Sequence, residues 1–429
     1  MDRRLVILFL TIFIDLMGFG IFIPVVPFVA RDLGASDALV GDTAVVFSVL
    51  MYLFGPFWGA VSDRYGRRPV IAIAVAISGV SYLLFSFAHG IVLLFISRML
   101  TGVGSANIAA AQAYITDITP PENRAKSLGL VGAAFGLGFI AGPPLGGVVY
   151  HYLGTAWVGY VAAGLCLVNL LGIWLLLPES LHQRDPHAPI RFAPITATVR
   201  ALRDIRFRDI YLIGFIYIAA FSMMQTAVPL LWKDDYGLTE AQISYMFAAV
   251  GLASAIVQGG LLGWLNKRFG ERRLVIMGTI LVAAGLALTG LVPRAWFIPA
   301  AFVPIACLAL GNGMLWPSLA AMLTRQADQK EQGQVLGMNQ SFGSLGRIAG
   351  PFMAGRAYEL WHLLPFLGGS AIMLATYFYI RGFLHRLDQR IGLRPDRGGG
   401  LLSRPPDQPG PPSSHERPRQ FEEQGHRPG

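Results

Sequence analysis

Charged residues and cysteines are both scarce in this sequence. Asp, Glu, Lys and Arg make up 14% of the 429 residues and 54% are hydrophobic, whereas a soluble domain carries about a quarter charged residues. Water is therefore not the main solvent expected for this chain. The only two cysteines, Cys166 and Cys307, lie inside apolar runs, so the sequence implies neither a disulfide framework nor a thiolate metal site.

Motifs of soluble enzymes are also missing. The sequence has no glycine-rich nucleotide loop, no histidine cluster with metal-ligand spacing and no nucleophile elbow. We therefore expect no enzymatic activity, no catalytic residue, no bound metal and no cofactor. The net charge of +9 is accounted for by basic loops at one membrane face, and it does not favour a nucleic-acid partner.

Long apolar stretches recur along most of the chain. A bilayer core about 30 Å thick needs about 20 apolar residues per helix, and these stretches lack the alternation of an outer-membrane barrel. The first one contains Asp15 and Pro24, which argues against a cleaved signal peptide. We predict an all-α integral membrane protein with twelve transmembrane helices at 5–28, 39–61, 69–88, 91–116, 127–150, 156–177, 209–231, 241–263, 273–292, 296–323, 334–356 and 363–384.

Basic residues predict the orientation of these helices, because Lys and Arg concentrate in cytoplasmic loops. With both termini inside, 28 of the 34 Lys and Arg fall in cytoplasmic segments. The exceptions are four residues in external segments and two within helices: Arg31, Lys233, Arg294 and Arg356, then Arg98 and Arg347. We therefore predict a multi-pass protein of a bacterial-type plasma (inner) membrane with both termini cytoplasmic.

The chain is predicted to contain two similar halves. A polar, arginine-rich cytoplasmic linker at 178–208 separates an N-terminal six-helix bundle at 1–177 from a C-terminal one at 209–384. The tail at 385–429 is rich in Arg, Pro, Gly and Gln and is expected to be a disordered cytoplasmic segment. Five residues of the first half (Gly55, Gly59, Arg64, Gly66 and Arg68) recur 204 positions later, and three more (Gly138, Gly142 and Pro143) recur at Gly346, Gly350 and Pro351. This repetition predicts two pseudo-symmetric bundles with the substrate path between them.

A first motif lies at the end of the second predicted helix and in the loop after it. Glycines four residues apart share one helix face and permit close helix approach. Asp63 at the membrane edge can pair with Arg67 or face the positive end of a neighbouring helix, and such a bond can form in one conformation and break in another. A membrane anchor with a glycine turn is the simpler alternative. The predicted gating residues are Gly55, Gly59, Asp63, Arg64, Gly66, Arg67, Arg68 and Asp117.

This motif resembles that of the major facilitator superfamily, and the resemblance covers about residues 5–384. It implies the two-bundle major facilitator fold, in which Asp63 engages Arg67 and an acid at the end of the fourth helix, Asp117. The second half has Lys267 where the aspartate of the motif would stand. An equivalent latch is therefore not expected there.

Arg98 lies inside the fourth predicted helix, where a charge costs roughly 2.5–3.5 kcal/mol on insertion scales. It should face a cavity or an acid, or else reach the external interface with its long side chain. Its motif, Arg98 to Gly104, resembles the helix-4 motif that the superfamily uses in proton transfer. We therefore group Arg98 with the proton-coupling residues.

The fifth predicted helix carries regularly spaced glycines and a proline pair. Glycines four residues apart favour close packing, and Pro143 and Pro144 should bend the helix. We predict a seam between the two halves that acts as a hinge, with close packing alone as the alternative. The motif resembles that of the superfamily's exporters; the predicted hinge residues are Gly138, Gly142, Pro143, Gly146 and Gly147.

Asp15 is the only carboxylate deep within any predicted helix, in a segment similar to the helix-1 signature of drug:proton antiporters. A low-dielectric environment favours its protonated form, so a proton and a cationic substrate could compete for it. The alternative is that Asp15 satisfies a backbone group or pairs permanently with an arginine. With Arg98 it forms the predicted proton-coupling pair.

The predicted function is proton-coupled antiport that exports small amphipathic compounds or drugs, driven by the proton gradient. The alternatives are an importer or facilitator of a small metabolite, and a membrane receptor that does not transport. The partners expected are a small-molecule substrate, protons and lipid, with the protein a monomer. Other intramembrane polar residues are more often interhelical hydrogen bonds than ligands; the predicted substrate-binding residues are Gln112, Gln225, Asn312 and Asn339. No acid lies in the third or ninth predicted helix, where tetracycline exporters carry them, which favours a broad, weakly charged substrate set.

Overall fold

The computed structural model describes residues 3–120, 124–181, 194–328 and 331–391. Within these residues every regular element is a helix. The first half contains α1 (Arg3–Asp32), α2 (Asp37–Tyr65), α3 (Arg67–Ser86), α4 (Ile91–Gly104), η1 (Ser105–Asn107), α5 (Ile108–Ile118), α6 (Arg124–Leu153) and α7 (Thr155–Leu176). After it come α8 (Pro194–Arg203), α9 (Arg208–Asp234), α10 (Glu240–Ile256), η3 (Val257–Leu261), α11 (Leu262–Leu291), η4 (Arg294–Trp296), α12 (Phe297–Gln326), α13 (Gln332–Leu360) and α14 (Leu364–Ile391).

Most predicted helices lie where the apolar stretches placed them, and three details differ. The fourth is interrupted by the 3₁₀ turn η1, and the eighth ends in the π-helical turn η3. The predicted polar linker contains a short helix, α8, although its residues 182–193 lie outside the described part. The predicted tail is likewise outside it from residue 392 onward.

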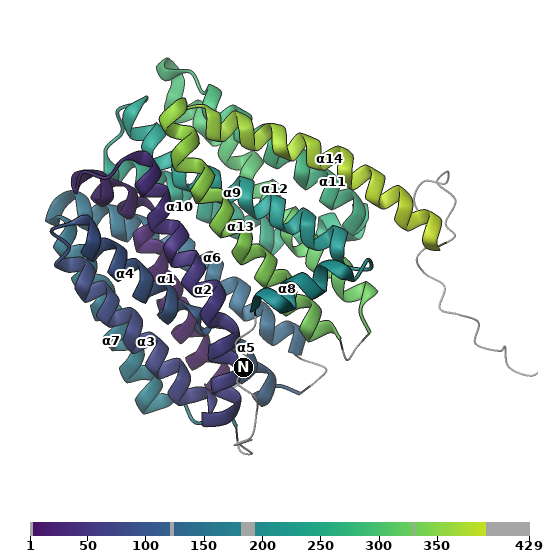
Figure 1. Cartoon of the computed structure of the whole chain (residues 1–429), viewed down its shortest axis with the longest axis horizontal. Coiled ribbons are helices and arrows are strands. Elements are labelled where there is room, and N and C mark those ends of the chain that lie inside the picture. Colours follow the sequence, from purple (N-terminus) through teal and green to yellow (C-terminus); the bar gives the residue numbers. More distant parts are fainter. Residues whose placement is uncertain (1–2, 121–123, 182–193, 329–330, 392–429) are drawn as a thin grey trace, which may run out of the picture. The chain divides into compact units, whose positions relative to one another are not determined.

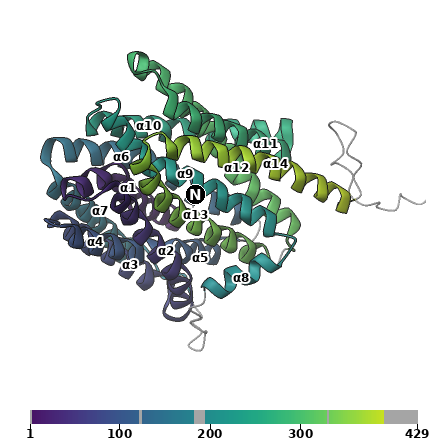
Figure 2. The same cartoon turned by 45° about the horizontal axis from the view of Figure 1, so that its top comes forward.

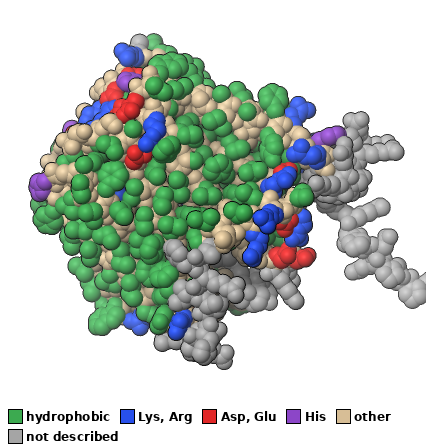
Figure 3. All heavy atoms as spheres, in the orientation of Figure 1, with side chains coloured by type: hydrophobic (Ala, Val, Ile, Leu, Met, Phe, Trp, Pro, Cys, Tyr) green, Lys and Arg blue, Asp and Glu red, His purple; other side chains and the backbone are tan. Residues whose placement is uncertain are grey.

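Several of these helices are suited to crossing a membrane. Nine helices within the described residues are long and apolar enough to span a bilayer, and α10 is a shorter apolar helix. Many large apolar side chains are exposed, for example Val92, Trp174 and Phe378, each 70% exposed. Figure 3 shows apolar side chains across the middle of one face and charged ones near two opposite rims. The protein is therefore an all-α membrane protein, while the count of twelve spans stays a prediction.

Helices far apart in the sequence pack in an order that repeats in the two halves. In the first half α1 packs along α6, and in the second half α9 packs along α13 (Figures 1 and 2). Two further pairs join the halves, α2 with α13 and α6 with α10. The helices up to Leu384 form one compact unit. The bounds predicted for two separate bundles stay a prediction.

Two glycine turns occupy equivalent positions of the repeat. Gly66 separates α2 from α3 with φ of +109°, and Gly270 interrupts α11 with φ of +74°. Residues other than glycine rarely adopt positive φ, because the Cβ atom meets the backbone. The glycine spacing of 204 residues thus marks the same sharp turn twice.

Candidate functional site

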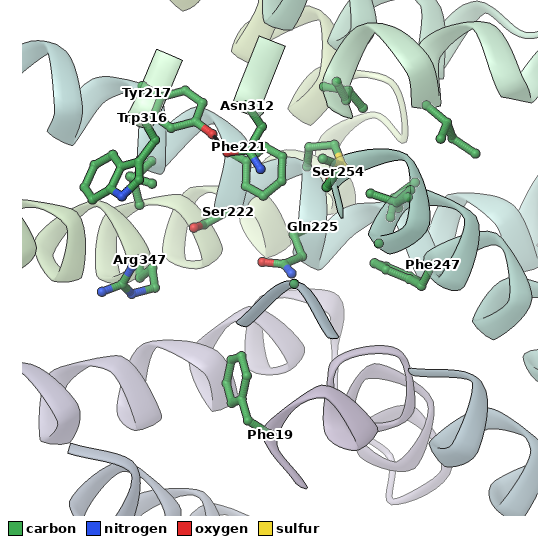
Figure 4. Close-up of a pocket in the computed structure, with 18 of the residues that line it drawn as sticks. Phe19, Tyr217, Phe221, Ser222, Gln225, Phe247, Ser254, Asn312, Trp316 and Arg347 are labelled. Carbon is green, nitrogen blue, oxygen red and sulfur yellow. Dashed lines mark hydrogen bonds between the residues drawn. The ribbon is translucent and has the colours of Figure 1, made fainter. Parts of the chain in front are cut away.

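A central cavity of about 370 Å³ lies between helices of both halves. Its wall is mainly apolar and aromatic, with Phe19 of α1 facing Phe221 and Trp316 of the second half (Figure 4). Cavities of this size and character are typical of small-molecule sites. Its charged and amide-bearing residues come from four helices: Asp15, Gln225, Asn312, Gln340 and Arg347.

Asp15 is the one carboxylate in this wall. Asn107 of the 3₁₀ turn η1 interacts with its side chain, the residue is 8% exposed, and its Oδ1 atom is buried without a hydrogen-bond partner. No lysine or arginine among the described residues lies within ion-pair distance of it. A permanent pair with an arginine, one of the alternatives considered for Asp15, is therefore not observed. Because charge in such a place is costly unless compensated, this carboxyl is suited to binding a proton or a basic group.

Two of the four predicted substrate residues line the cavity. Gln225 projects into it from α9, and Asn312 of α12 accepts a hydrogen bond from the hydroxyl of Tyr217 (Figure 4). Gln112 and Asn339 are not among the residues of its wall. Their assignment as substrate-binding residues stays a prediction.

Arg98 lies beside a second, smaller cavity next to the central one. It is 5% exposed, so its side chain does not extend to the protein surface. Its guanidinium carbon lies 5.5 Å from the ring centre of Phe22 and 5.0 Å from that of Phe47, while its Nε atom is buried without a hydrogen-bond partner. These aromatic faces partly stabilise the cation. Its part in proton coupling stays a prediction.

The gating motif forms a compact ionic cluster, in which Arg67 is the central residue. Its Nη1 atom lies 2.6 Å from Asp63 Oδ1, and its Nε atom lies 3.1 Å from Asp117 Oδ2. Ser62 accepts a further hydrogen bond from Nη1 at 2.6 Å. Arg67 therefore joins the end of α2 to the end of α5. Whether this cluster opens and closes the transport path stays a prediction.

Glu179 also binds to this cluster, and the sequence motif did not predict its part in it. Its carboxylate accepts hydrogen bonds from the backbone N–H groups of Arg67 at 2.9 Å and Arg68 at 3.3 Å. These are unpaired donors of the first turn of α3, where a negative charge is favourable. Glu179 thus fixes the start of α3 and with it the position of Arg67.

The remaining motif residues have mixed surroundings. Arg64 lies over the ring of Tyr65, and Arg68 donates to the backbone carbonyl of Trp174. An added Cβ atom would meet nothing within 4 Å at Gly55 and only an ordinary contact, 3.8 Å from Ala109, at Gly59. The unusually close helix approach expected at these two glycines is therefore absent from this conformation: no described atom lies near Gly55, and α5 lies only at ordinary contact distance from Gly59.

The second half does contain a pair at the equivalent place, contrary to expectation. Glu271 follows Gly270 as Arg67 follows Gly66, and it accepts an ion pair from Arg325 at 2.9 Å. Arg325 lies at the end of α12, as Asp117 lies at the end of α5. The base follows the glycine in the first half and the acid follows it in the second, so the charges of the pair are reversed. The residue at Lys267 gives no indication of this pair.

This reversed pair predicts a rescue by charge exchange. The Glu271→Arg substitution places two like charges together and should lower the transport rate by about two- to fivefold, because solvent around Arg325, which is 63% exposed, weakens the pair although Glu271 is only 9% exposed. The double variant Glu271→Arg with Arg325→Glu should recover most of the rate. A double variant as slow as the single one would contradict a role for the pair itself.

The glycine seam of α6, formed by Gly138, Gly142 and Gly146, packs within its own half rather than between the halves. A Cβ atom at Gly138 would lie 2.9 Å from Leu16 Cβ, and one at Gly142 would lie 2.7 Å from the carbonyl oxygen of Met17. At Gly146 it would overlap the carbonyl oxygen of Ile21. The predicted seam between the halves is thus wrong for these three glycines, because their shared helix face is turned to α1.

Gly147, one residue further along, faces the other half. An added Cβ atom there would overlap the side chain of Ser244 in α10. Successive helix residues point about 100° apart, so one residue is enough to change the neighbour. Pro143 is buried in the α1 contact, 3.2 Å from a Cβ atom built at Gly20. The hinge role of these residues stays a prediction.

Ion pairs also join the halves at the helix ends remote from the gating motif; we call Arg31, Asp37, Asp42, Asp234 and Arg356 the distal cluster. Arg31 of α1 lies 2.8 Å from Asp234 of α9 and 2.6 Å from Asp37. Arg356 of α13 lies 2.9 Å from Asp42 of α2. Asp42 and Asp63 are 21 residues apart in one helix, roughly 30 Å at 1.5 Å per residue. The two ionic clusters therefore occupy opposite ends of the molecule's helices.

The sequence as a whole matches a known family. The family model described as Major Facilitator Superfamily matches residues 8–351 and 210–419. The chain belongs to the major facilitator superfamily. Members of this superfamily are transporters rather than enzymes, so the ionic clusters and the central cavity belong to a multi-pass membrane transporter.

Curated relatives within the superfamily include drug-resistance proteins. The tetracycline resistance protein, class C, of Escherichia coli is 31% identical over 383 residues, which cover 87% of this chain and 95% of the relative. Multidrug resistance protein 2 of Bacillus subtilis (strain 168) is 29% identical over 381 residues, 86% of this chain and 92% of the relative. The protein is thus a major facilitator superfamily transporter similar to the drug efflux members.

Solved structures support the same fold. The human organic anion transporter MFSD10 (TETRAN) aligns with a TM-score of 0.68 at 24% identity, over 88% of this chain and 99% of that one. The nucleoside transporter NupG aligns with a TM-score of 0.74 at 12% identity, over the same shares of the two chains. At these identities the likeness describes the major facilitator fold alone.

Proposed function

We propose that this superfamily member is a proton-coupled antiporter that exports small amphipathic compounds by alternating access. The observation that carries the proposal is Asp15, a buried carboxyl without a counter-cation in the wall of a mainly apolar central cavity. An intramembrane acid of this kind is costly and is retained where it takes part in a transport path.

The coupling follows from competition at a single carboxyl. When Asp15 binds a proton it is neutral, and when it loses the proton its charge needs a basic group of the cargo. Proton and cargo therefore occupy the same acid in turn. The proton gradient supplies the energy, without a cofactor.

The proposed direction is export. The tetracycline and multidrug resistance proteins among the relatives support it, as does the glycine and proline motif of α6. In the proposed arrangement both termini face the cytoplasm of a bacterial-type inner membrane, and the distal cluster faces outside. The partners are the small-molecule cargo, protons and lipid, with no nucleic acid, and one chain suffices.

Alternating access requires contacts that exist in one state and break in the other. The distal cluster has this character, since two of its ion pairs cross between the halves while its side chains remain partly exposed. The Asp63, Arg67 and Asp117 cluster lies at the other end. In the proposed cycle the halves rock about the central cavity, so that the distal pairs separate when the external side opens.

Breaking the distal pairs should therefore favour the externally open state. Arg31→Gln combined with Arg356→Gln should increase the labelling of a cysteine at Ser222 by an impermeant maleimide several-fold, in a background without other cysteines. Each of the two partly exposed pairs contributes up to about 1 kcal/mol. Arg294→Gln, another basic residue of the predicted external side, is the matched control. Equal labelling in all three proteins would show that the distal cluster does not hold this side closed.

The proposed function is tested with purified protein in vesicles under an imposed pH gradient. An amphipathic dye should move against its concentration gradient in the direction opposite to proton movement, and it should equilibrate passively when the gradient is collapsed. Movement of dye and protons in the same direction would support an importer instead. Dye binding without any flux would support a receptor.

A further inference from the structure

Arg347 of α13 is a second charge in the wall of the central cavity, and it also borders the smaller cavity. Its only hydrogen bond given by the structure runs from Nη2 to Ser344 Oγ at 3.0 Å, within the same helix. Among the described residues no carboxylate lies within 4 Å of its guanidinium. Arg347 is therefore a cation that the protein itself does not neutralise.

Other arginines placed between helices have partners that compensate their charge. Arg67 is paired with two carboxylates, Arg356 with Asp42, and Arg98 lies against two aromatic rings. Arg347 has none of these compensations in the described structure. An intramembrane cation is expensive unless it faces water, an acid or a functional partner. Because Arg347 lies in the cavity wall, an acidic group of the cargo can supply the missing counter-charge.

The surroundings of Arg347 suit the apolar part of such a cargo. Gly343, one turn earlier on α13, lies under the indole of Trp316, whose ring atom would be 3.1 Å from a Cβ atom built there. Figure 4 shows Trp316 and Arg347 on the same side of the cavity, across from Phe19. An aromatic surface beside a guanidinium fork matches a molecule whose acidic group is attached to an apolar ring system.

We propose that Arg347 binds an anionic group of the cargo, so that the preferred cargo is an amphipathic zwitterion whose basic group reaches Asp15. Asp15 and Arg347 both line the cavity and form no ion pair with each other. A guanidinium binds a carboxylate or related oxyanion through two parallel hydrogen bonds. This inference rests on the proposed function for its basic group, while the anionic contact at Arg347 stands on its own.

The test measures binding by equilibrium dialysis against the whole protein in lipid nanodiscs, with two matched probes. Naphthylalanine is a zwitterion, and naphthylalanine amide has the same ring and amine but no carboxylate. The wild-type protein should bind the zwitterion about tenfold or more tightly, as expected for a charge-assisted hydrogen-bonded pair. Tighter or equal binding of the amide by the wild-type protein would overturn the proposal.

Variants separate the charge of Arg347 from its structural role. In Arg347→Gln the affinity for the zwitterion should fall to that for the amide, whose own affinity should be unchanged. Arg347→Lys should keep most of the preference, and Arg381→Gln, an exposed arginine of α14, should keep all of it. A preference that survives in Arg347→Gln would assign the carboxylate to another group and overturn the proposal.

The outcome is distinguishable from that of the proposed function. The probe preference is a binding measurement and needs neither flux nor a proton gradient. If the preference depends on Arg347 but vesicles show no proton-coupled movement, the antiport proposal fails and the anionic site stands. If proton-coupled movement occurs but the preference for the zwitterion is absent, the anionic site at Arg347 fails and the antiport proposal stands.

Discussion

The Asp15→Asn variant is expected to lose proton-driven transport while it still binds cargo and exchanges it across the membrane. The amide occupies nearly the same volume and can still interact with Asn107, but it cannot bind and release a proton. Transport against a gradient should therefore fall by roughly tenfold or more, whereas exchange of labelled for unlabelled dye should persist. Both rates are measured in the same vesicles.

The control for this variant is Asp328→Asn, which removes an exposed carboxylate in the loop after α12. It should leave both rates close to those of the wild-type protein. Driven transport that survives in Asp15→Asn would remove this carboxyl from the coupling. Loss of exchange as well as driven transport would point to a damaged cavity instead.

The Gly146→Val variant is expected to be severely destabilised. The Cβ atom of any larger residue at this position would overlap the carbonyl oxygen of Ile21, and a backbone atom of a packed helix cannot move aside as a flexible side chain can. Overpacking of this kind costs about 3 kcal/mol or more, because α1 and α6 must separate. Thermal unfolding in detergent should show a markedly lower Tm or no folded protein.

The matched control is Gly164→Val on α7, where an added Cβ atom meets nothing within 4 Å and the residue is exposed. This change should leave the Tm nearly unchanged, although both variants add the same side chain to a helix. A normal Tm for Gly146→Val would mean that α1 and α6 are not packed as closely as the structure shows.

Most helices could be predicted from the sequence because a membrane-spanning helix has a distinctive amino-acid composition. Each one must be long and apolar, whatever it packs against. The recurrence of Gly66 at Gly270 was also visible in the sequence, and both residues adopt a positive φ, which restricts the residue type. The contact of Asp63 with Arg67 was predicted from their closeness in one sequence motif. These features depend on local rules alone.

Contacts between residues that are distant in the sequence could not be predicted. The spacing of Gly138, Gly142 and Gly146 indicated a close-packed face, but not that α1 would fill it. Glu179 is far from Arg67 in the sequence, and its role as a cap exists only once α3 begins beside it. The wall of the cavity likewise depends on how several helices are rotated.

The ion pair of the second half was also not predicted, because its charges are reversed relative to those of the first half. A motif search asks for a particular residue at a particular position, whereas the physical requirement is an opposite charge at contact distance. Glu271 and Arg325 satisfy that requirement with the signs exchanged. Arg347 was visible as an intramembrane charge, but only the structure shows that it lines the central cavity without an acid beside it.

The central claim is that cargo and proton exchange at one carboxyl, and proton release on binding tests it most directly. Adding an excess of an amphipathic basic dye to the detergent-solubilised protein in weak buffer should release up to about one proton per bound dye, at a pH at which Asp15 is protonated before the dye binds. The Asp15→Asn variant should bind the dye and release none. Equal proton release by both proteins would contradict the account.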